Sequence, residues 1–153
     1  MGKIPLDKDV ESFVYKCGTK ARESMSAGDF DSAEKFYLEA WSALPYPKES
    51  HDHAHSISVA VTKFYREIGE TEKSLSWLKI AKKAYGNSIA GEASLGFLLA
   101  TILYEGGRFD QAYEEFDKLF KKYNKRPFQG EKNEYLEFYL NKRVKEGGGD
   151  EAS

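Results

Sequence analysis

The sequence predicts an all-α protein built from repeated pairs of helices, and three observations predict it. One motif occurs three times, beginning at Gly28, Gly69 and Gly107, which lie 41 and 38 residues apart. Within each copy, small and large apolar residues recur at steps of four and three, which is one face of an α-helix. Each glycine separates two helical stretches, where a residue that tolerates positive φ lets the chain reverse. Three such copies indicate a repeat array.

The aligned positions define the repeat. A bulky or β-branched residue stands two places after the glycine, followed by a small residue, a large one and a final apolar one. In this order they are Phe30, Thr71 and Phe109; Ala33, Ser74 and Ala112; Tyr37, Leu78 and Phe116; and Ala40, Ala81 and Leu119. The steps from the small residue onward place the last three positions on one helical face.

Turn signals between the copies set the expected helix boundaries. Pro45 and Pro47 end the first pair because proline disfavours helix in the residue before it, and Ser50 is a favourable N-cap for the next helix. Gly91 and Gly96 interrupt the most apolar stretch, each at a cost of about 1 kcal/mol relative to alanine, which favours a central helix with closely approaching neighbours. The expected helices are 9–27 and 29–44, 51–68 and 71–85, 88–106 and 109–123, and a last single helix at 131–145.

The last predicted helix is expected to cap the array, because each repeat buries its apolar faces only against neighbours. Leu136, Tyr139 and Leu140 can form its inner face. Tyr135 and Phe138 widen the apolar arc, and they either pack under the preceding loop or form a dimer contact through this helix. The predicted organisation is one domain: a lead-in at 1–8, a repeat domain at 9–146 with repeats at 9–45, 50–86 and 88–124 and a cap at 131–145, and a disordered tail at 147–153.

These residues resemble the tetratricopeptide repeat (TPR) family, whose unit is an antiparallel pair of helices. The first copy matches best, with Gly28, Phe30, Ala33, Tyr37, Ala40 and a closing Pro45. The resemblance implies a right-handed α-α superhelix of three TPR-like helix pairs plus a C-terminal capping helix. The second and third copies lack the closing proline, since Gly86 and Asn124 stand in its place. Two further features depart from the family. The large aromatic residue of the first helix is replaced by Cys17, Ser58 and Gly96, and both periods exceed the usual 34 residues.

In the resembled family, the first helix of each pair lines a concave groove that binds a protein or peptide. Residues one turn apart on these helices select Tyr15, Arg22, Met25, Val59, Lys63, Arg66, Phe97, Thr101 and Tyr104. This surface is basic in the middle and aromatic at one end, which suits a segment with acidic and apolar side chains. The alternatives are a solvated face with incidental aromatic residues, or a groove filled by the protein's own cap.

Some members of the family clamp the acidic C-terminal tails of heat-shock chaperones with a fixed set of lysine, asparagine and arginine residues. The matching positions here are Gly18, Arg22, Ala60, Ser94 and Leu98. Only Arg22 is basic, so the resemblance does not extend to this clamp.

Two further groups were weighed as chemical sites. All three histidines lie in one cluster, and His51 and His55 are four apart, a spacing that can hold a metal ion on one helical face. No carboxylate or cysteine pattern completes such a site, so a solvated helix start around His53 is the favoured interpretation. Cys17 lies at a predicted packing position, where a cysteine behaves as a small hydrophobe. No catalytic signature is readable, and neither an enzyme nor a cofactor or metal is expected.

Composition narrows the class of partner. A formal net charge of −2 over 153 residues gives no broad basic field for nucleic acid. No apolar run approaches the ~18 residues of a membrane span, and the first residues lack the apolar core of a secretory signal, so a cytoplasmic location is expected. The sequence therefore predicts a scaffold that binds a protein or peptide. A dedicated inhibitor of one partner, such as a toxin-neutralising immunity protein, is the alternative, and a metal-linked role is a weaker one.

Overall fold

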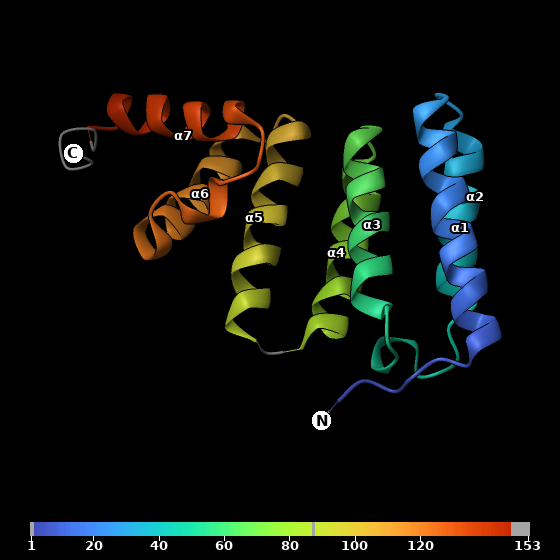
Figure 1. Cartoon of the computed structure of the whole chain (residues 1–153). Coiled ribbons are helices and arrows are strands. Elements are labelled where there is room, and N and C mark those ends of the chain that lie inside the picture. Colours follow the sequence, from blue (N-terminus) through green and yellow to red (C-terminus); the bar gives the residue numbers. More distant parts are fainter. Residues whose placement is uncertain (1, 87, 148–153) are drawn as a thin grey trace. The chain divides into compact units, whose positions relative to one another are not determined.

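The structure, a computed structural model, describes residues 2–86 and 88–147 and confirms the all-α prediction over those residues (Figure 1). Its helices are α1 (Lys8–Ser26), α2 (Phe30–Ser42), α3 (Ala54–Glu67), α4 (Thr71–Tyr85), α5 (Ile89–Glu105), α6 (Phe109–Tyr123) and α7 (Asn133–Lys145). Two short 3₁₀ helices, η1 (Lys48–Ser50) and η2 (Arg126–Phe128), lie in the longer connections. Residues 148–153 of the predicted tail lie outside the described residues.

The three predicted turns share one hydrogen-bonding pattern. Gly28, Gly69 and Gly107 have φ angles of 76°, 81° and 76°. Each glycine N–H donates to the carbonyl three residues earlier, and the next N–H donates to the carbonyl five residues before it. This pair of bonds is the Schellman motif, which satisfies carbonyls left open at a helix C-terminus and needs a left-handed residue after the cap. The repeated glycine is therefore explained by backbone conformation.

Replacing Gly107 by alanine should lower the free energy of unfolding by about 1–2 kcal/mol, because an L-residue is disfavoured at this positive φ. A Cβ atom at this position would meet nothing within 4 Å, so the cost comes from the backbone alone. Gly106 is the matched control, since its φ of −83° suits alanine. Urea unfolding of both variants measures the difference, and equal stabilities would contradict the turn assignment.

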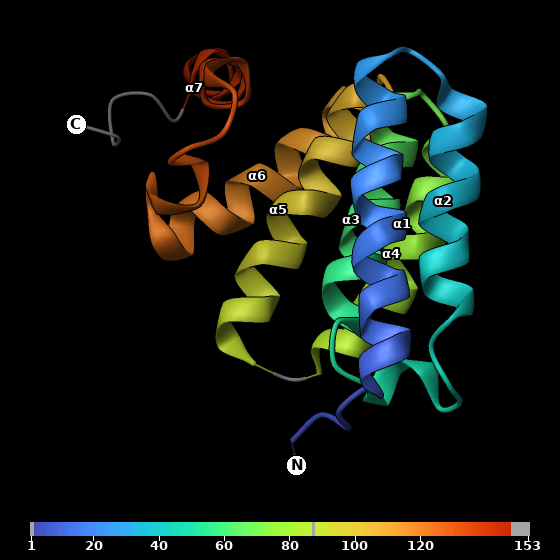
Figure 2. The same cartoon turned by 45° about the vertical axis from the view of Figure 1, so that its right-hand side comes forward.

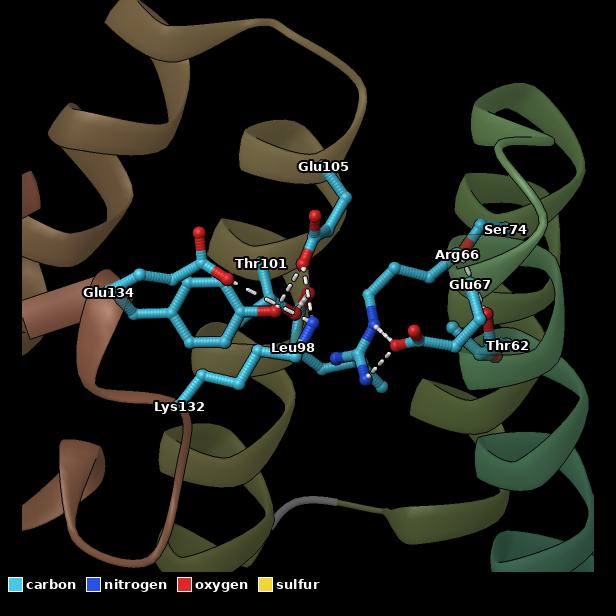
Figure 3. A network of polar contacts seen from close by, with 10 residues as sticks. Thr62, Arg66, Glu67, Ser74, Leu98, Thr101, Glu105, Lys132 and Glu134 are labelled. Atoms are coloured by element: carbon cyan, nitrogen blue, oxygen red, sulfur yellow. Dashed lines mark hydrogen bonds and ion pairs between the residues drawn. The ribbon is translucent and has the colours of Figure 1, made fainter.

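The small residues of the repeat mark the closest contacts within each helix pair. Ala33, Ser74 and Ala112 on the second helices and Ala21, Thr62 and Ala100 on the first helices are all fully buried. In the middle pair both small residues carry hydroxyls, and Ser74 Oγ donates to the Thr62 carbonyl at 2.8 Å (Figure 3). The bond satisfies a polar group that would otherwise be costly to bury.

The chain forms two compact units, one before and one after residue 87. In the first unit, α1 packs along α2 and α3 along α4, while α2 also contacts α3 (Figures 1 and 2). Its core contains Val14, Leu44, Val61 and Phe64, with Tyr37 packed against it. Because each helix packs one apolar face into the core, the opposite faces of α1 and α3 can carry polar and charged side chains.

The start of α3 differs from the prediction that Ser50 caps a helix beginning at His51. The helix begins at Ala54, and His53 occupies the N-cap with a φ of 70°. Residues before it are extended because Ile4 N–H donates to the Ser50 carbonyl and Asp52 N–H donates to the Ile4 carbonyl, both at 2.8 Å. The predicted lead-in is thus tied to the loop before α3, a long-range pairing that local signals do not reveal.

The second unit has an aromatic core formed by α5, α6, η2 and α7. The rings of Phe97, Phe116 and Phe128 lie 5.2–5.6 Å apart between centroids. Tyr135 and Tyr139 of α7 are fully buried against them. Tyr139 therefore lies on the inner face of α7, as predicted. Leu136 and Leu140, also predicted there, are only half-buried, and Tyr135 is buried in their place. Tyr135 and Tyr139 are four residues apart and therefore share one face of α7. Their rings are larger than the two leucine side chains and fill the core more completely.

Candidate functional site

The predicted groove residues of the first unit that remain exposed are basic or aromatic. Lys63 on α3 and Arg22 on α1 are exposed, and no described residue forms an ion pair with either. Tyr15, also on α1, is 57% exposed. Met25 and Val59 are half-buried, and Met25 packs on the core. These side chains could offer charge and apolar area together to a partner.

Contacts around Tyr37 indicate that Arg22 lies on the side of α1 that approaches the neighbouring helices. The ring of Tyr37, on α2, is 5.4 Å from the ring of Phe64, which directly follows Lys63 on α3. Burial raises the pKa of Tyr37, and the positive charge of Arg22 partly offsets that rise, so the guanidinium is close enough to act on the phenol. Arg22 itself bends back along α1, where its Nη2 donates to Thr19 Oγ1 at 3.3 Å.

Arg66 differs from Lys63 although both were selected from the same face of α3. Its Nε and Nη2 donate to Glu67 Oε1 at 3.0 and 2.8 Å (Figure 3). The Arg66 side chain is only 12% exposed, although a residue that lines a binding groove should be open to solvent before the partner binds. The neighbouring carboxylate neutralises the guanidinium, which makes Arg66 a weaker candidate for binding an acidic partner than Lys63.

A contact between α1 and the start of α3 lies beside Tyr15. The His53 ring is 5.3 Å from the Tyr15 ring in an edge-on arrangement, and its Nε2 lies 2.8 Å from Glu11 Oε2. Sequence reasoning did not single out Glu11. The left-handed conformation of His53 turns its side chain toward α1, and this conformation depends on the preceding extended segment, which carries no local signal.

The histidine cluster does not have the geometry predicted for a metal-binding face. His51 lies before α3, where its ring is buried and its Nδ1 is 3.0 Å from the Pro47 carbonyl. His55 lies on α3, exposed, with its ring edge-on to Tyr85 at 5.2 Å. Because His51 is not helical, the two rings do not share a helical face. Among residues 2–86 and 88–147, no three potential metal ligands lie together.

The predicted groove residues of the second unit are used in its own packing. Phe97 is buried, and its ring contacts Phe116, Phe128 and Tyr135. Thr101 is fully buried, and its Oγ1 donates to the Leu98 carbonyl at 2.8 Å (Figure 3). Phe97 is therefore not available for ring contacts with a partner, because rings from η2 and α7 cover it.

Tyr104 is half-buried at the edge of the same core. Its ring lies 5.0–5.4 Å from the rings of Phe109, Tyr135 and Phe138. Its hydroxyl donates to Glu134 Oε2 at 3.1 Å, and burial together with this bond raises the pKa of Tyr104. In this unit the protein's own C-terminal helix covers the predicted groove positions, which is one of the alternatives named in the sequence analysis. Tyr135 and Phe138 pack within the chain.

Glu105 joins α5 to the segment before α7 and was not singled out from the sequence. Tyr135 Oη donates to Glu105 Oε2 at 2.6 Å, and Lys132 Nζ lies 3.3 Å from the same oxygen. Figure 3 shows Glu105 and Lys132 converging, with Glu134 nearby. The short hydrogen bond to a carboxylate satisfies the buried phenol, so Glu105 orients α7 on the core.

Two shallow hollows are lined by residues that were not predicted as groove residues. One, in the first unit, has a volume of about 450 Å³ and is lined by Leu38, Tyr65, Glu72, Lys73, Ser76 and Trp77. The other, in the second unit, has a volume of about 460 Å³ and is lined by Phe120, Lys121, Lys122, Tyr123, Asn124 and Arg126. The first is mostly apolar, whereas the second is strongly basic.

Cys17 is buried in the first unit. Burial raises the pKa of its thiol, and the negative charge of Glu39 raises it further by a smaller amount. A raised pKa lowers the fraction of thiolate, the reactive form, which agrees with a packing role. Within the part of the chain that the structure describes, no helix has the length and apolar character needed to cross a membrane.

Comparison of this chain with protein-family models, with curated proteins and with solved structures gives no match.

Proposed function

We propose that this protein is a TPR-like helical-repeat scaffold that binds a protein or peptide segment carrying acidic and apolar side chains. The proposed binding surface is defined by Tyr15 and Arg22 on α1 and by Val59 and Lys63 on α3. The proposal includes a right-handed superhelical arrangement of the three helix pairs. It involves no catalysis and no cofactor, and it places the protein in the cytoplasm.

The repeated turn is the observation that carries the repeat-scaffold part of the proposal. The three glycine turns have nearly equal positive φ angles and the same two hydrogen bonds. In each pair, the first and the second helix each carry one fully buried small residue. A shared turn and a shared contact register make the pairs similar supersecondary units, as in a repeat array.

The charges on α1 and α3 support the choice of partner. Lys63 and Arg22 are exposed, and neither has an ion pair with a described residue, so binding an acidic partner would not require an existing pair to break. Tyr15 adds exposed ring area, and Val59 adds partly exposed apolar area. Aromatic and arginine side chains are those enriched at binding surfaces.

Reversing the two exposed charges, with Arg22→Glu and Lys63→Glu together, should weaken capture of an acidic partner about tenfold, which corresponds to 1.4 kcal/mol. The physical reason is that attraction becomes repulsion at two exposed sites, and the loss should resemble the effect of added salt. The measurement is a pull-down from native lysate, followed by titration of the captured partner at several salt concentrations. Far-ultraviolet circular dichroism should be unchanged.

The matched control reverses Lys35 and Lys79, two exposed lysines on the second helices α2 and α4. This variant has the same change in net charge but should retain capture. Equal retrieval by both double variants and by the unmodified chain would reject the α1–α3 surface. Retrieval of one partner at one-to-one stoichiometry would favour a dedicated inhibitor over a general scaffold.

A further inference from the structure

The basic hollow of the second unit lies where α6 ends and η2 begins. The nine residues from Lys118 to Arg126, KLFKKYNKR, include five basic residues and no acidic one. Three of these basic residues line the hollow together with two aromatic rings and one amide, and no carboxylate lines it. The hollow has a volume of about 460 Å³, which is sufficient for a small anion and part of the group that carries it.

Not all of the cations at this hollow are neutralised. Lys121 Nζ lies 2.9 Å from Asp117 Oδ2, and Lys122 Nζ lies 3.7 Å from Glu92 Oε1. Among the residues that the structure describes, none forms an ion pair with Arg126 or with Arg143. Although burial opposes the effect, Arg143 is close enough to Asp117 to help lower the pKa of that carboxyl, so the charge of Arg143 is partly offset. The charge of Arg126, which lines the hollow, has no such acidic neighbour among the described residues.

Two buried polar atoms of the second unit make no hydrogen bond of acceptable geometry with a described residue, namely Tyr123 Oη and Arg143 Nη1. Glu92 raises the pKa of Lys122, and the Lys122 ammonium is close enough to the Tyr123 hydroxyl for this group to raise it further. A lysine only donates, however, so the Tyr123 hydroxyl proton still lacks an acceptor. Tyr123 lines the hollow, and the Arg143 guanidinium, on α7, lies 5.0 Å over the ring of Phe120, which also lines it. Both atoms can donate a hydrogen bond. Buried donors in proteins almost always have an acceptor, so this pair needs an explanation.

We propose that this hollow binds an oxyanion of the phosphate type, held by Arg126 and Arg143 and by the hydroxyl of Tyr123. A phosphate group offers only acceptors to these donors, and the planar guanidinium matches its geometry. The carbonyl end of α6 opposes an anion with roughly half a negative charge, which is less than the charge of the two arginines. The Lys122 side chain lies over the Tyr123 ring, 5.4 Å from its centroid, and would turn aside to admit the anion.

The test is an NMR titration of the full chain with inorganic phosphate, with sodium chloride added to hold the ionic strength constant. Saturable shifts should be confined to residues 120–126 and to the side-chain Nε of Arg143. Arg126→Gln should weaken binding about tenfold or more. The control is Lys125→Gln, which removes one positive charge from the residue directly before Arg126. Lys125 does not line the hollow, so this variant should leave binding within about twofold. Shifts spread over all lysines, or equal effects of the two variants, would overturn the proposal.

A second variant tests the buried hydroxyl and does not depend on the charges. Tyr123→Phe keeps the ring and removes only Oη, so without phosphate its melting temperature should equal or exceed that of the unmodified chain. A ligand that binds only the folded state raises the melting temperature, and the rise grows with the logarithm of the ligand concentration once that concentration exceeds Kd. At equal phosphate concentration this rise should be smaller in Tyr123→Phe. An identical phosphate-dependent rise in both proteins would exclude the hydroxyl from the site.

The source of the phosphate is resolved by a second arm with phenyl phosphate. Because Phe120 and Tyr123 line the hollow, an aryl monoester should bind more tightly than inorganic phosphate if the natural ligand is a phosphorylated organic molecule. Equal affinity would identify the site as one for the free anion. Failure of both ligands to bind would overturn this proposal, and the pull-down with the α1–α3 variants would be unaffected because those residues lie in the other unit.

Discussion

Replacing Phe116 by alanine is expected to lower the free energy of unfolding by about 3–5 kcal/mol, the usual cost of removing a buried phenylalanine. The Phe116 side chain is fully buried. Its ring lies 5.3–6.3 Å from the rings of Phe97, Phe128, Tyr135 and Phe138. Alanine would leave a cavity shared by α5, α6, η2 and α7. Chemical denaturation followed by circular dichroism measures the loss.

Phe109 provides the matched control on the same helix. It is also a phenylalanine of the repeat, but it stands 48% exposed at the first position of α6. Phe109→Ala should therefore cost less than half as much as Phe116→Ala. Similar losses for the two variants would mean that the aromatic core does not have the arrangement described above.

Ending the chain at Gly130 removes α7 and is expected to cause the largest loss of all. Tyr135 and Tyr139 are fully buried, and each large buried side chain contributes roughly 1.5–3 kcal/mol. Their removal also leaves Asp117 without the Tyr139 hydroxyl, which donates to Asp117 Oδ1 at 2.6 Å. The expected result is a lower melting temperature and association through the exposed rings, measured by thermal unfolding and by size-exclusion chromatography with light scattering.

A chain ending at Gly147 is the control, because it keeps all of α7. It should remain as stable as the full chain, and it should elute at the same position. If the chain ending at Gly130 behaves in the same way as this control, then α7 does not cap the second unit, and the role predicted for it from repeat physics is wrong.

Helix positions and the repeat register could be read from the sequence because the signals that set them are local. The structure places α4 at Thr71–Tyr85 and α6 at Phe109–Tyr123, as predicted. It places α1, α2, α5 and α7 within two residues of their predicted bounds, which is the usual scatter of such assignments. Only α3 starts at a clearly different residue from the predicted one, because pairing between Ile4 and the segment around His51 overrides the favourable N-cap at Ser50. A contact between residues so far apart leaves no trace in local periodicity.

Which groove positions are open to a partner could not be read from the sequence. Spacing selected Lys63 and Phe97 by the same rule, yet Lys63 is exposed and Phe97 is buried. The rule identifies a helical face but not what packs on it. In the second unit α7 and η2 supply the rings that cover that face.

The sequence by itself therefore determined an all-α chain, its helix pairs and the glycine turns between them, because these follow from side-chain periodicity and backbone conformation. Only the tertiary structure decided that Arg66 pairs with Glu67 and that Glu105 accepts a hydrogen bond from Tyr135. It also decided that Tyr123 lines a basic hollow and that Arg143 lies over the ring of Phe120, another residue that lines it. These arrangements join residues from different helices or depend on rotamers within the packed fold. Their geometry is fixed by which surfaces meet, and not by the order of the residues along one helix.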